Sequence, residues 1–143
     1  MKITGAMTAI ATPMSEDGAV DYSYLNKLID YQIDNSISAI VAVGTTGESA
    51  TIDFDEHVSL IEYFVKYIDG RVKVIAGTGA NSTIEALELT KSAKDAGADA
   101  ALLVSPYYNK PTQEGLFLHH TKIADEVNFP QILYNLPSRT ACF

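Results

Sequence analysis

The sequence is poor in the features that mark secreted, membrane-spanning and nucleic-acid-binding proteins. Its single cysteine, Cys142, has no partner within the chain, so an internal disulfide is excluded. Only 10 Lys and Arg residues stand against 18 Asp and Glu residues, and the formal charge of −8 argues against a nucleic-acid-binding surface. No apolar run approaches the roughly 20 residues of a membrane span, and residues 1–14 lack the apolar stretch of a secretory signal. A cytoplasmic protein without membrane or nucleic-acid partners is therefore expected.

Five short apolar runs do recur along the chain, and they start about 31 residues apart. They are almost continuous in apolar residues, which is typical of parallel strands covered on both faces. The predicted strands are residues 6–11, 39–44, 72–77, 100–105 and 131–135.

The gaps between these runs carry apolar residues at helical spacing. Asp53 and Ser82 each precede a glutamate by three residues, a spacing typical of a helix start, and Gly97 is expected to end the third helix. No linker interrupts the series, so the sequence predicts repeated βα units.

Two α/β architectures contain such units. A doubly wound sheet fits 143 residues, so length alone favours a flavodoxin-like ligand-binding domain that is not an enzyme. A TIM (β/α)8 barrel needs about 250 residues, and this chain would supply roughly its first five strands and four helices. In that case residues 1–143 are the N-terminal part of a single barrel domain, with an inner face left open to water. The polar residues after the strands favour the barrel.

The loop VGTTGES, residues 43–49, follows the second predicted strand. Gly44 and Gly47 allow a tight turn, Thr45 and Thr46 add hydroxyls, and the loop amides can face a small carboxylate. The alternative is a turn whose threonines only fix the backbone. Residues 77–83, GTGANST, lack the third glycine of a dinucleotide-binding fingerprint and are interpreted as structural.

Tyr134 ends the fifth predicted strand, and Arg139 follows on a predicted loop beyond Pro137. A phenol can pass a proton when a second hydroxyl adjoins it, although a core tyrosine is an equal alternative. The planar guanidinium of Arg139 suits a carboxylate.

The three histidines lie on predicted helices, away from the strand ends. His57 and His120 are predicted to be half-buried. No metal-ligand spacing connects them or His119 with carboxylates, so no metal is expected.

Four motifs, in order, resemble the family of Schiff-base aldolases that includes dihydrodipicolinate synthase and N-acetylneuraminate lyase. They are VGTTGESATI, VIAGTGANST, SPYYNKPTQEGL and QILYNLPSRT, and the resemblance covers residues 3–140 without a gap. It implies a (β/α)8 barrel, a homotetramer and no organic cofactor. The implied reaction condenses pyruvate with L-aspartate-4-semialdehyde in lysine and diaminopimelate biosynthesis, through a Schiff base on a lysine of the sixth strand. A sialic-acid or sugar-acid lyase is the alternative within the family.

The resemblance also implies roles for individual residues. By matching position, Thr45, Tyr134 and Tyr108 resemble a catalytic hydroxyl relay, in which Tyr108 reaches across a subunit interface. Thr45 and Thr46 would hold the pyruvate carboxylate, and Arg139 would help to bind the semialdehyde.

A site for lysine as a feedback inhibitor, at a dimer interface, is a further implication. Glu85 would pair with the amine of the inhibitor and Asn81 would bond its carboxylate. Phe54 stands where some lysine-sensitive members have histidine, so both sensitivity and an ordinary polar interface stay open. The matching positions are Ser49, Ala50, Phe54, His57, Asn81, Glu85 and Tyr107.

No lysine of this chain suits the Schiff-base role. That amine must be deprotonated, which requires burial or a cationic neighbour at the end of an apolar strand. The eight lysines lie in helical segments, in a loop, at the N-terminus or, for Lys73, at the opposite end of a strand. We therefore expect the nucleophile and strands six to eight to come from the missing C-terminal half, and this chain alone to be inactive.

Overall fold

Five parallel strands form one sheet in the order in which they occur along the chain. The structure is a computed structural model that describes residues 3–142. Each strand pairs in parallel with the next, for example Ile40 with Val74 and Leu102 with Ile132. The strands are β1 (Met7–Ala9), β2 (Ala39–Ala42), β3 (Lys73–Gly77), β4 (Ala100–Val104) and β5 (Gln131–Tyr134), so all five predicted strands are confirmed to within a few residues.

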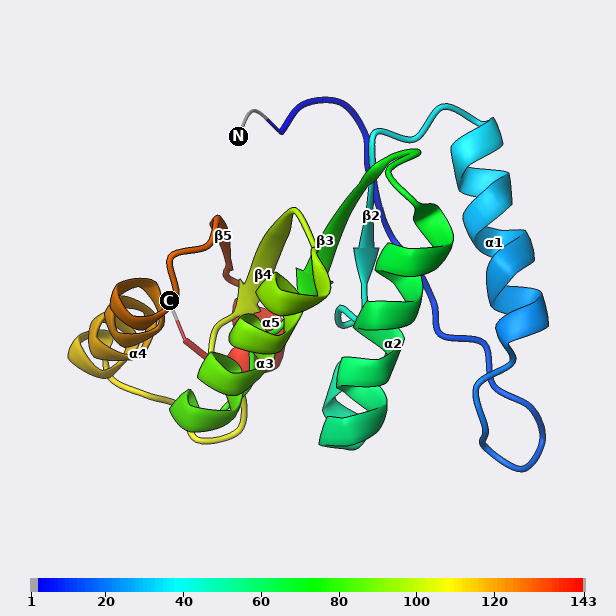
Figure 1. The fold of residues 1–143 in the computed structure, drawn as a ribbon. Helices are drawn as coiled ribbons and strands as arrows, with labels where there is room; N and C mark the ends of the chain where they lie inside the picture. Colours follow the sequence, from blue (N-terminus) through cyan, green and yellow to red (C-terminus); the bar gives the residue numbers. More distant parts are fainter. Residues whose placement is uncertain (1–2, 143) are drawn as a thin grey trace.

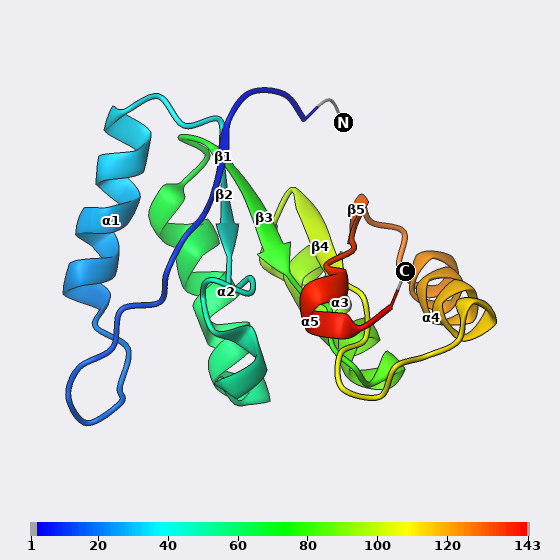
Figure 2. The ribbon, with the colours of Figure 1, turned by 180° about the vertical axis from the view of Figure 1, so that it is seen from behind.

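The connecting helices cover one face of this sheet, as the two opposite views show (Figures 1 and 2). A doubly wound sheet would interrupt the strand order and carry helices on both faces. The flavodoxin-like alternative that length favoured is therefore wrong, and the architecture is that of the first part of a (β/α)8 barrel. The helices are α1 (Tyr22–Asp34), α2 (Phe54–Ile68), α3 (Thr83–Ala96) and α4 (Gln113–Glu126).

The predicted helix boundaries are confirmed by their caps. The Asp53 carboxylate accepts a hydrogen bond from the Glu56 amide at 2.9 Å, and Gly97 ends α3 with a left-handed φ of 92°. Two short elements stand where the sequence predicted only loops: η1 (Ser49–Thr51) and α5 (Pro137–Thr140). Four residues are too few to show a helical period, which explains why α5 was missed.

Alternation along the strands divides the core into two layers. Ile40 and Val74 pack beneath the helices, with the fully buried Phe64 of α2 among their neighbours. Val41 and Ile75 belong to a smaller cluster on the opposite face of the sheet, which no helix formed by residues 3–142 covers. Both side chains are nevertheless buried. The expectation of a wet inner face is therefore wrong at its centre.

None of the helices within residues 3–142 is long and apolar enough to cross a lipid bilayer.

Candidate active site

The loop between β2 and α2 is held in place from both sides at the carboxyl edge of the sheet. On one side, the buried Thr12 donates its hydroxyl hydrogen to the carbonyl of Gly47 at 2.8 Å. On the other, β3 approaches so closely that a Cβ added at Gly77 would lie 2.2 Å from the carbonyl oxygen of Val43. The predicted structural role of the Gly77 turn therefore agrees with the geometry, while Thr12 gave no sequence signal because its partner is 35 residues away.

Val43 is the strained residue of this loop. It is fully buried and has a φ of 51°, a left-handed conformation that costs a β-branched residue of the order of 1–3 kcal/mol. Glu48 in the same loop and Tyr108 after β4 also have positive φ. Such strain persists only where the surrounding structure enforces it. Positive φ also occurs after α1 at Ser36 and after α2 at Asp69, but Val43 is the buried, β-branched case.

Thr45 and Tyr134 line one small cavity at this edge, together with Ser49 and the glycines of the β3 loop. Tyr134 reaches it from the inner face of β5, whose polar end lies beside the loops after β2 and β3. The cavity volume is about 10 Å³, which is the lower limit for one water molecule. The two hydroxyl-bearing side chains predicted to share a site are thus brought together.

A second cavity of about 250 Å³ adjoins the first through Thr45 and Ser49, which line both. Among the described residues that line this cavity, Arg139 is the only charged one, so the cavity suits an anion. The sequence predicted Arg139 on a loop, whereas the structure places it in α5, where its amide donates to the carbonyl of Leu136 at 2.9 Å.

Two other predicted residues line neither cavity. Thr46 is exposed, and Tyr108 has 90% of its surface exposed with a φ of 73°. Because its ring is so exposed and lines neither cavity, Tyr108 completes no relay with Thr45 and Tyr134 within residues 3–142.

His57 differs from its predicted environment. It is only 3% exposed rather than half-buried, and its Nε2 lies 2.7 Å from the carbonyl oxygen of Gly77, at the end of β3 rather than distant from strand ends. Because a carbonyl accepts, Nε2 carries the hydrogen. Burial lowers the pKa of His57, and the bond to Gly77 only partly opposes this effect. The signal was present in the sequence: His57 stands three and four residues before the buried Leu60 and Ile61.

The residues matched to an inhibitor site are only partly gathered. Ser49, Ala50 and Tyr107 line the 250 Å³ cavity. Burial, and to a lesser degree the negative charge of Glu85, raises the pKa of Tyr107. Glu85 does not line the cavity. The backbone oxygen of Asn81 accepts a hydrogen bond from Asn109 at 3.3 Å.

All seven lysines between residues 3 and 142 are exposed, and Lys2 lies outside the described residues. Lys73 pairs with Asp99 at 2.6 Å, at the amino end of β3. None of the seven described lysines lines either of the two cavities. This part of the site therefore holds hydroxyls, backbone amides and one guanidinium, without a buried amine.

Strands in sequential parallel order, helices on one face and polar loops at the carboxyl edge define the class: the chain is part of a (β/α)8-barrel protein. A sequence profile of the dihydrodipicolinate synthetase family matches residues 2–143, and the chain belongs to that family.

Individual relatives agree with this assignment. The chain is 61% identical over 140 residues to a 4-hydroxy-tetrahydrodipicolinate synthase of Pseudomonas putida (strain W619), and the match covers 98% of this chain and 48% of the relative. Among solved structures, the dihydrodipicolinate synthase of Acinetobacter baumannii, complexed with pyruvate, is 55% identical with a TM-score of 0.96, covering 99% of this chain and 48% of that one. The Aquifex aeolicus enzyme is 54% identical with a TM-score of 0.95, covering 98% and 47%. The chain therefore spans about half the length of the curated relatives it matches.

Proposed function

We propose that residues 1–143 form the N-terminal part of a single barrel domain that, when complete, condenses pyruvate with L-aspartate-4-semialdehyde. This is the activity of 4-hydroxy-tetrahydrodipicolinate synthase, in lysine and diaminopimelate biosynthesis. The observation that carries the proposal is the position of Thr45, which lines one cavity with Tyr134 and the adjoining cavity with Arg139. The names of the relatives and the pyruvate in the Acinetobacter structure support it.

Each side chain then has a chemical task. Thr45 and Thr46, with the amides of their loop, hold the pyruvate carboxylate, and Arg139 binds the carboxylate of the semialdehyde. Thr45 and Tyr134 relay protons together with Tyr108, which a neighbouring subunit of a homotetramer supplies. The strong exposure of Tyr108 supports a role outside its own subunit.

The nucleophile comes from the rest of the barrel. A lysine amine attacks the keto carbon of pyruvate, the oxygen leaves as water, and the hydroxyl relay supplies the proton that this departure needs. The same relay then removes a proton from the pyruvate methyl group, and the resulting enamine attacks the aldehyde carbon while the relay returns the proton to the aldehyde oxygen. The amino group of the semialdehyde then attacks the Schiff-base carbon, which closes the ring and releases the lysine amine. The exposure of every described lysine supports an external amine. No cofactor takes part, and the compartment is the cytoplasm.

Lysine, the end product, is the proposed effector of the dimer-interface site. Glu85 faces the amine of the effector, and Asn81 and Tyr107 face its carboxylate. The Nε2 of His57 is already bonded to Gly77, so His57 contributes only through its other ring atoms. The remaining residues of the proposed site are Ser49 and Ala50.

The test co-expresses this chain with the part of the Pseudomonas putida relative that follows the matched 140 residues. We expect condensation of pyruvate with the semialdehyde, and a loss in kcat of about 10² or more in Tyr134→Phe, because one relay hydroxyl is removed. The matched control is Tyr24→Phe, an exposed tyrosine of α1. Full activity of Tyr134→Phe would contradict the relay, and cleavage of N-acetylneuraminate without condensation would favour a sugar-acid lyase.

A further inference from the structure

We propose that Thr12 is a positioning residue for the loop that holds pyruvate. Its hydroxyl fixes the peptide group between Gly47 and Glu48, and that peptide group in turn sets the position of Thr45. The inference rests on the proposed function, in which Thr45 contacts pyruvate. Thr12 lines neither of the two cavities, so it acts through the loop and not on the substrate itself.

The peptide group between Gly47 and Glu48 is hydrogen-bonded at both of its polar ends. Its carbonyl oxygen accepts the hydroxyl hydrogen of Thr12 at 2.8 Å. Its N–H donates to the carbonyl oxygen of Thr45 at 3.2 Å. The carbonyl and the N–H of a trans peptide lie in one plane and point in opposite directions. The bond from Thr12 therefore also fixes the direction in which the N–H reaches Thr45.

The backbone of Glu48 shows that this orientation is not the one the loop itself prefers. Its φ is 63°, a left-handed conformation that is unfavourable for a residue with a Cβ. Turning the peptide group over changes only the ψ of Gly47 and the φ of Glu48. Glycine accepts the new angle without strain, and Glu48 returns to an ordinary negative φ. The turn also breaks the bond to Thr45, and the hydroxyl of Thr12 opposes it.

The donor belongs to a segment that is itself fixed. Thr12 is only 5% exposed and precedes Pro13, which favours an extended backbone at Thr12. The carbonyl of Pro13 accepts the amide of Asp21, the N-cap of α1, at 2.8 Å. On the other side, the amide of Ile10 donates to the carbonyl of Val41 in β2 at 3.2 Å. The hydroxyl is therefore presented from a segment held between β2 and α1.

The acceptor is enclosed as closely as the donor. Gly47 is buried, and a Cβ added to it would lie 3.1 Å from both the Thr12 hydroxyl and the Cα of Val43. A buried carbonyl that loses its donor is destabilising. The substitution Thr12→Val keeps the shape of the side chain and removes the hydroxyl, so the peptide group turns away and releases the carbonyl of Thr45.

The two substrates respond differently to this change. The threonines and amides that hold the pyruvate carboxylate belong to the displaced loop. Arg139, which binds the semialdehyde, belongs to α5, where its amide donates to the carbonyl of Leu136 at 2.9 Å. Removal of the Thr12 hydroxyl therefore weakens the binding of pyruvate and leaves that of the semialdehyde unchanged.

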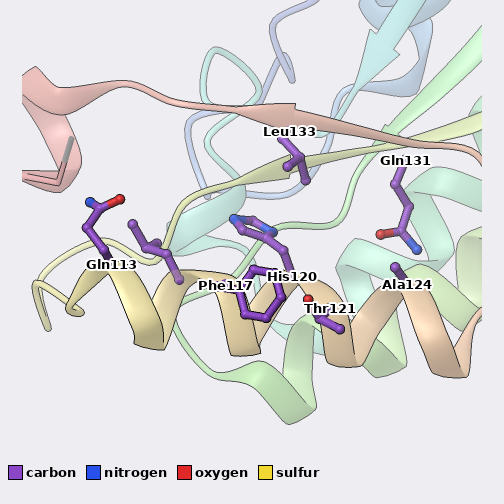
Figure 3. A pocket seen from close by; sticks show the side chains of 8 residues that line it. Gln113, Phe117, His120, Thr121, Ala124, Gln131 and Leu133 are labelled. Carbon is purple, nitrogen blue, oxygen red and sulfur yellow. The ribbon is translucent and has the colours of Figure 1, made fainter.

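The experiment uses the complex of this chain with the second half of the Pseudomonas putida relative. Thr12→Val removes the hydroxyl and Thr12→Ser retains it. Two controls make the same change from threonine to valine elsewhere. Thr8→Val removes a hydroxyl of β1 that donates to Gln32 at 2.9 Å. Thr121→Val lies on α4, at the cavity of about 550 Å³ beside β5, which the loop does not line (Figure 3).

The first readout is hydrogen exchange of the Glu48 amide, measured by mass spectrometry, which requires no catalysis. We expect exchange at least about tenfold faster in Thr12→Val than in Thr12→Ser, the controls and the wild type. Glu48→Gly is a second variant that keeps the hydroxyl and removes the left-handed penalty, so it tests the proposal even where Thr12→Val does not assemble. Its amide should exchange about threefold more slowly, relative to the intrinsic rate. Unchanged exchange in both variants overturns the proposal.

The second readout is steady-state kinetics. We expect Thr12→Val to raise the KM for pyruvate about tenfold, to lower kcat and to leave the KM for the semialdehyde unchanged. Thr12→Ser should restore the pyruvate KM, and both controls should match the wild type. Partial misfolding lowers only kcat, so a lower kcat with both KM values unchanged assigns Thr12 a purely structural role and overturns the proposal. A complex that shows the exchange difference but binds no pyruvate refutes the proposed function and leaves Thr12 as the residue that fixes the loop.

Discussion

At the residue scale, the sequence indicates which side chains lie near one another where residues follow strand ends, and it gives no indication where a tertiary contact decides their position. Thr45, Tyr134 and Arg139 were predicted because parallel strands bring their carboxyl ends to one edge, and they do line adjoining cavities. Val43 could not have been predicted, since a β-branched residue is disfavoured in a left-handed conformation and only the packing of neighbouring loops imposes it.

The histidines give a prediction at this scale. Burial lowers the pKa of His57 and His120, and burial with the adjacent His120 lowers the pKa of His119 to about 4. Below about pH 6.5 the histidines of the unfolded chain therefore bind protons that those of the folded chain do not. The contribution of these histidines to the free energy of unfolding is thus fully present above about pH 6.5 and is lost as the pH falls toward about 4.

We expect the free energy of unfolding, measured with urea, to fall by about 1–2 kcal/mol between pH 7.5 and pH 5, a figure reduced for partial solvent screening. Few carboxylates titrate in that window, which keeps the effect specific to the histidines. The control is His119→Asn, which should flatten part of the slope. A stability that is constant across the window, or that rises toward pH 5, would contradict the burial of these rings.

At the element scale, the strands were predictable because buried parallel strands are continuous apolar runs in the sequence. The helices were predictable because capping residues mark where they begin. The short helix α5 was not, and it is the element that brings Arg139 to the cavity. The close approach of β3 to the β2–α2 loop could not be predicted from the sequence either. A glycine at position 77 is compatible both with an ordinary turn and with a close contact between two backbone segments.

The substitution Gly77→Ala tests whether β3 packs this closely against the β2–α2 loop. The added methyl would lie 2.2 Å from the carbonyl oxygen of Val43, so either β3 or the loop must move. We expect a loss of about 1–3 kcal/mol in thermal or urea unfolding. Gly115→Ala, in the first turn of α4, is the control, because its added methyl would meet the Thr112 hydroxyl at 3.3 Å rather than a backbone atom at 2.2 Å, and it should cost much less stability. Equal stability of the two variants would show that the loop is not held as described.

At the scale of the whole sheet, the strands formed by residues 3–142 run in the order β1 to β5, with β1 and β5 at its two edges. The fold class followed from the polar residues at the strand ends and from strand order, whereas length alone pointed to the wrong architecture.

The most direct measurement of the central claim is borohydride reduction of the co-expressed complex in the presence of pyruvate, followed by peptide mass spectrometry of both halves. The account predicts one pyruvate adduct on a lysine of the partner half and none on this chain, where every described lysine is exposed and lines neither cavity. An adduct on a lysine of this chain would contradict it, because the amine that attacks the keto carbon would then be local.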